Sequence, residues 1–98
     1  MHRIKHFNII HTSDGYIVHN TKHPFNKSHT HIKSFNYCKR LVYNVLYNRR
    51  PKTKNLYLLE SHCRISDNES YITLIEQLKE SRSRNKEQYI NVQKGVKR

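Results

Sequence analysis

The stretch from Ser34 to Lys54, SFNYCKRLVYNVLYNRRPKTK, constrains the fold of this chain more than any other. Its apolar residues recur at the three- and four-residue spacing of a helix with one buried face. Ser34 is a suitable N-cap, because its hydroxyl can accept a hydrogen bond from a free backbone N–H. Pro51 cannot continue a helix and restricts the residue before it. We therefore predict a helix over 34–48. The residues on its apolar stripe are Phe35, Cys38, Leu41, Val42, Val45 and Leu46.

The same stretch carries six Lys and Arg residues and no Asp or Glu. Exposed tyrosines beside Lys and Arg are the combination that stacks unpaired bases and neutralises phosphates. Two plainer interpretations stay open: the tyrosines cover the edge of the core, and Arg49 and Arg50 complement the negative end of the helix dipole. The candidate nucleic-acid-binding residues are Lys39, Arg40, Tyr43, Tyr47, Arg49, Arg50, Lys52 and Lys54.

The distribution of charge supports an anionic partner. The formal net charge is +12, from nineteen Lys and Arg against seven Asp and Glu. Residues 1–59 hold eleven of the basic residues and a single acid, Asp14, whereas residues 60–98 are nearly balanced. A positive field of this strength attracts phosphate backbones and speeds association with them.

Two cysteines are too few for a disulfide framework, so we expect Cys38 and Cys63 to be reduced thiols. The N-terminal residues lack the apolar core of a secretory signal. No apolar run is long enough for a transmembrane helix. We expect a cytoplasmic protein without a membrane partner, in the host cytoplasm if a phage encodes it.

The first 33 residues favour strands. Arg3–Thr12 and Tyr16–Asn20 are rich in β-forming residues and flank an Asp-Gly pair, a strong hairpin signal. With Asp14 and Gly15 as the loop, Thr12 would face Ile17. A lone hairpin is marginal in water, so it needs helices or a further strand, for which His29–Ile32 is the candidate.

The remaining residues predict two more helices and a tail. Asn55–Arg64 reads as a short helix with Leu56, Leu59 and Cys63 on one side. Ser66 and Glu69 form a capping box that should open a helix over 67–82. We therefore predict one α+β domain, residues 1–82, with a β-hairpin, a possible third strand and three helices in the order ββ(β)ααα. Residues 83–98 are expected to form a frayed basic tail.

Leu58–Leu78 superficially resembles a helix-turn-helix motif, with Ile65 and Ser66 as the turn. The resemblance implies that the following helix would enter a DNA groove. That helix begins with Asp67 and Glu69, which phosphates would repel, and Arg64 stands where glycine is usual. A helical hairpin within the core is the favoured interpretation.

Eight histidines raise the question of a metal or a nuclease. A hairpin followed by a helix, with His and Asn around it, resembles the ββα-metal fold of small nucleases. No signature of that fold can be aligned between His11 and Asn48, and no histidine spacing matches a zinc site. His29 and His31 could still act as acid and base in a small ribonuclease. We predict no metal and no other cofactor.

The function these patterns favour is non-catalytic binding of RNA, DNA or a ribonucleoprotein by a small accessory protein. The Lys, Asn, Ile and Tyr bias suggests an AT-rich genome, and the chain resembles accessory proteins of bacteriophages and mobile elements in size and style. One alternative is an inhibitor that binds a host or defence enzyme, for example a CRISPR effector, or an acidic protein surface. A His-dependent nuclease is the second alternative.

Overall fold

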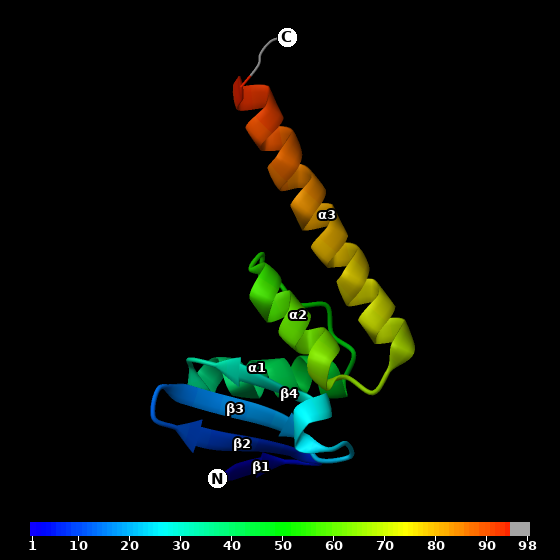
Figure 1. The fold of residues 1–98 in the computed structure, drawn as a ribbon. Coiled ribbons are helices and arrows are strands. Elements are labelled where there is room, and N and C mark those ends of the chain that lie inside the picture. The colour runs from blue at the N-terminus through cyan, green and yellow to red at the C-terminus, as the bar shows by residue number, and fades with distance from the viewer. Residues whose placement is uncertain (95–98) are drawn as a thin grey trace.

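The computed structural model of the chain consists of a four-stranded antiparallel sheet, two helices packed on it, and a third helix packed on the second (Figure 1). The structure describes the backbone of residues 1–94 and the side chains of residues 1–82. The strands are β1 (His2–Ile4), β2 (Phe7–Thr12), β3 (Gly15–Asn20) and β4 (His29–Ile32), in that spatial order. The helices are α1 (Phe35–Leu46), α2 (Leu56–Ile65) and α3 (Glu69–Lys94), and the 3₁₀ turn η1 (Phe25–Lys27) precedes β4. The predicted α+β class is confirmed.

One face of the sheet forms the core. Alternate residues of β2, β3 and β4 point towards α1 and α2, as the two-residue period of a strand requires. The buried apolar residues on this face include Phe7, Ile9, Val18 and Ile32. The candidate third strand is present, since β4 pairs with β3 and places His19 opposite His29.

The sheet has one strand more than predicted, because Arg3–Thr12 is not continuous. The chain reverses at Lys5 and His6, where Lys5 takes a φ of 53°. The side chain of Arg3 donates to the Lys5 carbonyl at 3.0 Å, which closes the turn. Ile4 then pairs with Phe7, and β1 becomes an edge strand. No Gly, Pro or Asn marks this turn in the sequence.

The predicted pairing of β2 with β3 is wrong, because the two-residue loop lies one residue earlier in the chain than expected. Thr12 pairs with Gly15, and not with Ile17, so the loop is Ser13-Asp14. Gly15 belongs to β3, with a φ of 153°, and a Cβ there would lie 3.0 Å from the carbonyl oxygen of Ile32. Glycine is therefore favoured here for two reasons: the positive φ, which L side chains rarely adopt, and the close approach of β4.

Helix α1 agrees with its prediction. The Ser34 hydroxyl accepts from the backbone N–H of Tyr37 at 3.2 Å, as expected of the N-cap. Cys38, Leu41, Val42 and Val45 are buried. The helix ends two residues before the predicted 48.

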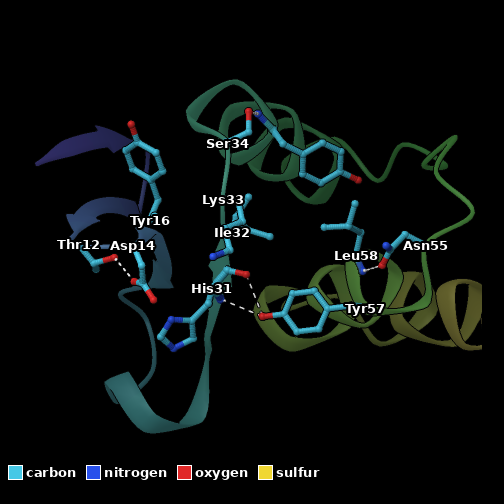
Figure 2. Close-up of a pocket in the computed structure, with 12 residues that line it drawn as sticks. Thr12, Asp14, Tyr16, His31, Ile32, Lys33, Ser34, Asn55, Tyr57 and Leu58 are labelled. Carbon is cyan, nitrogen blue, oxygen red and sulfur yellow. Dashed lines mark hydrogen bonds between the residues drawn. The ribbon is translucent and has the colours of Figure 1, made fainter.

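Helix α2 begins at its Asn55 N-cap, but the predicted apolar side is only partly right. Leu59 is buried, whereas Leu56 is 39% exposed and Cys63 is half-buried. Because α2 packs against the sheet, α1 and α3, several of its sides are buried, and these include positions with polar residues. Ser61 bonds to Thr30 of β4 at 2.7 Å. At the N-terminal end of α2, the Tyr57 hydroxyl bonds to the backbone of His31 in β4 (Figure 2).

The capping box is not the start of α3. The helix begins at Glu69, two residues later than predicted, because the Asn68 side chain accepts from the N–H groups of Ser70 and Tyr71. Ser66 instead follows the end of α2. Helices α2 and α3 form the expected helical hairpin, in which Lys79 pairs with Glu60. The α3 helix continues to Lys94, past the predicted end at 82, so the backbone is helical over much of the expected tail. Residues 95–98 of that tail lie outside the described residues.

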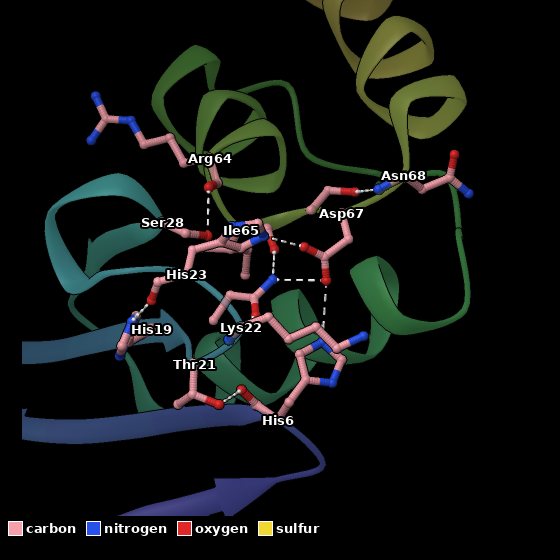
Figure 3. Close-up of polar contacts among 12 residues, drawn as sticks. His6, His19, Thr21, Lys22, His23, Ser28, Arg64, Ile65, Asp67 and Asn68 are labelled. Carbon is pink, nitrogen blue, oxygen red and sulfur yellow. Dashed lines mark hydrogen bonds and ion pairs between the residues drawn. The ribbon is translucent and has the colours of Figure 1, made fainter.

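A polar cluster joins the sheet to the α2–α3 turn (Figure 3). The fully buried Asn20 donates to the Ile65 carbonyl and to Asp67, both at 3.0 Å. Asp67 also contacts His23 at 2.5 Å and His6 at 3.4 Å. Burial raises the pKa of Asp67, but the hydrogen bonds from Asn20 and His23, together with the charges of His23 and His6, lower it below its ordinary value. The cluster fixes α3 relative to the sheet.

In the part of the chain that the structure describes, every helix is too short or too polar to span a bilayer.

Candidate nucleic-acid interface

Two tyrosines and an arginine form a stacked row on the exposed side of α1. The rings of Tyr43 and Tyr47 lie nearly parallel, with an interplanar angle of 6° and centroids 6.2 Å apart. The guanidinium of Arg49 lies 5.5 Å from the centroid of the Tyr47 ring. The tyrosines are 41% and 54% exposed, so part of each side chain is open to solvent. We call Tyr43, Tyr47 and Arg49 the aromatic row.

The end of α1 sets the direction in which Arg49 leaves the helix. Asn48 adopts a left-handed φ of 54°, and the N–H of Arg49 donates to the Asn44 carbonyl at 2.8 Å. This is the Schellman pattern, in which asparagine substitutes for the usual glycine. The Arg49 carbonyl then accepts from the Tyr71 hydroxyl of α3 at 2.6 Å. The aromatic row is thus anchored to two helices.

The connector between α1 and α2, residues 49–54, alternates between buried and exposed positions. Pro51 is buried, and Thr53 is half-buried against the Tyr37 hydroxyl. The intervening residues are exposed cations: Arg50, Lys52 and Lys54. Exposed cations at alternate positions can contact more than one phosphate of the same strand. We call Arg50, Lys52 and Lys54 the basic connector.

The two remaining candidates on α1 are arranged differently. The Lys39 ammonium lies over the Phe35 ring, 5.2 Å from its centroid, and its side chain is half-buried. Arg40 is exposed beside Tyr37, whose pKa is raised by burial and held down in part by this guanidinium. Lys39 lies one helical turn before Tyr43, so it continues the aromatic row along α1. The structure therefore groups the candidates into a row on α1 and a cationic connector, with Arg40 beside them.

Carboxylates pair with cations elsewhere in the fold. Glu60 pairs with Lys79 and Arg64, and Asp67 pairs with His6 and His23. None of the six candidate cations has a carboxylate partner in this part of the chain. Their charge is available to an external anion.

The histidines of the nuclease alternative lie on the other face of the sheet. His29 stacks on Phe25, with centroids 4.3 Å apart, and its Nδ1 bonds to the Phe25 carbonyl at 2.7 Å. His31 lies edge-on to His29. Asp67 does not contact them, because it pairs with His6 and His23. Within the described residues, no three His, Cys, Asp or Glu side chains gather to hold a metal.

The cysteines are not suited to nucleophilic chemistry. Burial raises the pKa of Cys38 and Cys63 to about 11, and Glu60 adds to the effect at Cys63. Both are therefore neutral thiols near pH 7, and both are free.

The sequence did not indicate a cavity of about 570 Å³ beside the connector (Figure 2). Its walls come from four segments: the β2–β3 turn, the end of β4, the start of α1 and the start of α2. Three tyrosines line it, Tyr16, Tyr37 and Tyr57. Tyr16 and Tyr57 have ordinary places in a predicted strand and helix, and Tyr37 stands out only for lying off the apolar stripe of 34–48, so no local pattern joins the three.

Comparison with known proteins gave no match: no protein-family model, no curated protein sequence and no solved structure is detectably similar to this chain. The function is therefore argued from the geometry.

Proposed function

We propose that this protein binds single-stranded nucleic acid, without catalysis, through the aromatic row and the basic connector. The observation that carries the proposal is the continuity of these two features. Two exposed tyrosine rings lie parallel, a guanidinium lies over the second ring, and the chain continues from that guanidinium into three exposed cations. Stacking platforms beside a positive backbone track are the shared design of single-strand binders.

The tyrosine rings of the aromatic row favour single strands over duplexes. Ring faces contact bases only when those bases are unpaired and accessible. A duplex would use the cations alone, because its bases are stacked internally. The proposed partner is thus unpaired RNA or DNA, free or within a ribonucleoprotein. The protein is proposed to act in the cytoplasm as an accessory protein of a phage or mobile element, which agrees with its AT-rich residue bias and free thiols.

The basic connector provides the test. Replacing Arg50, Lys52 and Lys54 together by Ala removes three phosphate contacts from exposed positions. The logarithm of the association constant should then fall less steeply with the logarithm of salt, by about 2, since each single-strand phosphate contributes about 0.7. Fluorescence anisotropy with a labelled single-stranded oligonucleotide measures both affinity and slope.

A matched control removes the same charge elsewhere. Lys5, Lys22 and Lys27 are exposed and lie outside the connector, so their replacement by Ala should change affinity far less. If both triple variants lose the same affinity and slope, only the overall charge matters and the proposed surface is wrong. If neither loses affinity but the protein forms a stoichiometric complex with a host enzyme, the inhibitor alternative replaces the proposal.

A further inference from the structure

We propose that the tyrosine-lined cavity receives one base of the bound strand, and that it prefers bases with an exocyclic amino group. This inference rests on the proposed function and identifies where the strand is read. The cavity, of about 570 Å³, falls within the range of small-ligand sites.

The walls of the cavity are held in place by polar contacts, so it is preformed. The Tyr57 hydroxyl donates to the His31 carbonyl at 2.8 Å and accepts from the His31 N–H at 3.3 Å. The Tyr37 hydroxyl lies against Thr53. Figure 2 shows Tyr57 reaching from the start of α2 towards the strand at His31. Fixed aromatic rings lose little conformational entropy when a flat ligand stacks on them.

The lining chemistry suits a heterocycle better than a lipid or a simple anion. Beside the tyrosine rings, Ile32 and Leu58 supply apolar surface. Polar residues also line the cavity, among them Asp14, Lys33 and Asn55. A flat ring with polar edges matches this combination of aromatic walls and scattered polar groups.

Asp14 gives the cavity its proposed preference. It is the single acid among the first 59 residues, and its Oδ1 accepts from the Thr12 hydroxyl at 3.2 Å. A carboxylate beside an anion-binding surface weakens phosphate binding, so its place there calls for another role. Carboxylates accept hydrogen bonds from the amino groups of cytosine and other amino-bearing bases, whereas uracil and thymine carry no amino group and offer only the ring N3–H.

The basic connector leads into this cavity. Lys54 directly precedes Asn55, which lines the cavity and caps α2. Thr53 lies against Tyr37, another lining residue. A backbone bound along Arg50, Lys52 and Lys54 would therefore be led to the wall of the cavity at Asn55. The positive charge of the connector suits the phosphates of a single strand, and the shape of the cavity suits one of its bases.

The test titrates ¹⁵N-labelled protein with three probes: adenosine 5′-monophosphate, uridine 5′-monophosphate and ribose 5-phosphate. Adenosine monophosphate should shift the amide signals of Gly15, Lys33 and Leu58, uridine monophosphate should do so more weakly, and ribose phosphate should not. Equal shifts from all three probes, or no shifts at the cavity, would overturn the base site.

Two variants make the test specific. Leu58→Trp fills the cavity without changing charge and should weaken adenosine monophosphate binding about tenfold, the scale of one lost base stack. Asp14→Ala lies on an exposed turn and leaves the core intact. It should make the affinities for adenosine and uridine monophosphate equal. If Asp14 acts only through its charge, both nucleotides should instead bind more tightly and the preference for adenosine monophosphate should be unchanged.

The same variants separate the two proposals. If the connector variant loses oligonucleotide binding while no nucleotide enters the cavity, the proposed function holds and the base site is wrong. If adenosine monophosphate enters the cavity but the connector variant binds the oligonucleotide normally, the connector is not the strand surface. If Leu58→Trp lowers oligonucleotide affinity for intact strands but not for strands of abasic sites, the base site is supported.

Discussion

His62 shows how a single residue ties stability to pH. It lies on the side of α2 that faces α1 and is fully buried. Its Nδ1 bonds to the Leu58 carbonyl at 2.7 Å, and its Nε2 bonds to the Asn44 amide at 3.2 Å. Burial lowers the pKa of His62 from its ordinary 6.5, although the bond to Leu58 opposes the effect. The neutral imidazole satisfies both partners, donating at Nδ1 and accepting at Nε2.

The pKa of His62 predicts acid sensitivity. Because the folded pKa is lowered, the unfolded chain binds more protons just below pH 6.5, so the free energy of unfolding falls as pH drops through that range. Above pH 6.5 the contribution is fully present. Urea unfolding between about pH 7 and pH 5 measures the slope. In His62→Gln the slope should diminish, while in the exposed His11→Gln it should persist; an unchanged slope in His62→Gln contradicts this assignment.

At the scale of single elements, α1 has two faces with separate roles. One face is buried in the core, and the other presents the aromatic row. Replacing Tyr43 and Tyr47 by Leu keeps apolar cover over the core edge but removes the aromatic faces. Single-strand affinity should fall about tenfold per tyrosine, since each base stack contributes roughly 1–3 kcal/mol. Thermal unfolding should change little.

Anisotropy measures that loss, and the Phe variants of Tyr43 and Tyr47 are the matched control because they retain the rings. They should bind nearly as the wild type does. If the Leu variants also bind normally, the tyrosines only cover the core edge and contribute nothing to recognition.

Elements with local signals were predicted from the sequence with good accuracy. The apolar spacing, Ser34 and Pro51 all lie within the segment they define, so the limits of α1 were predicted to within two residues. The reversal at Lys5, the register at Gly15 and the Asn68 cap depend on contacts between distant segments or on competition between neighbouring caps. Local patterns carry no information about such contacts.

The candidate site was predictable to the same extent. The residues of the aromatic row and the basic connector are near neighbours in the sequence, and charge and composition indicated them. The cavity is built from four segments between Thr12 and Leu58, and no spacing rule connects those segments. Asp14 was interpreted as a turn residue alone. Only the folded arrangement places it beside three tyrosines.

At the scale of the whole molecule, charge and shape act together. The described chain is elongated, 54 × 32 × 22 Å, and α3 projects past α2 (Figure 1). Its net charge of +12 draws any nucleic acid towards it, duplex or single-stranded. Non-specific attraction alone weakens steeply with salt, whereas base stacking is far less affected. The salt dependence of the affinity therefore distinguishes long-range charge attraction from base stacking.

The most direct measurement is an anisotropy titration of the wild-type protein with single- and double-stranded RNA and DNA of matched length. It is made at about 50 mM and about 150 mM salt, the upper value being near physiological ionic strength. We expect the protein to release duplexes at the higher salt and to keep single strands bound, because only unpaired bases reach the aromatic row. Equal retention of duplexes, or loss of every ligand at the higher salt, would contradict recognition of single strands by this surface.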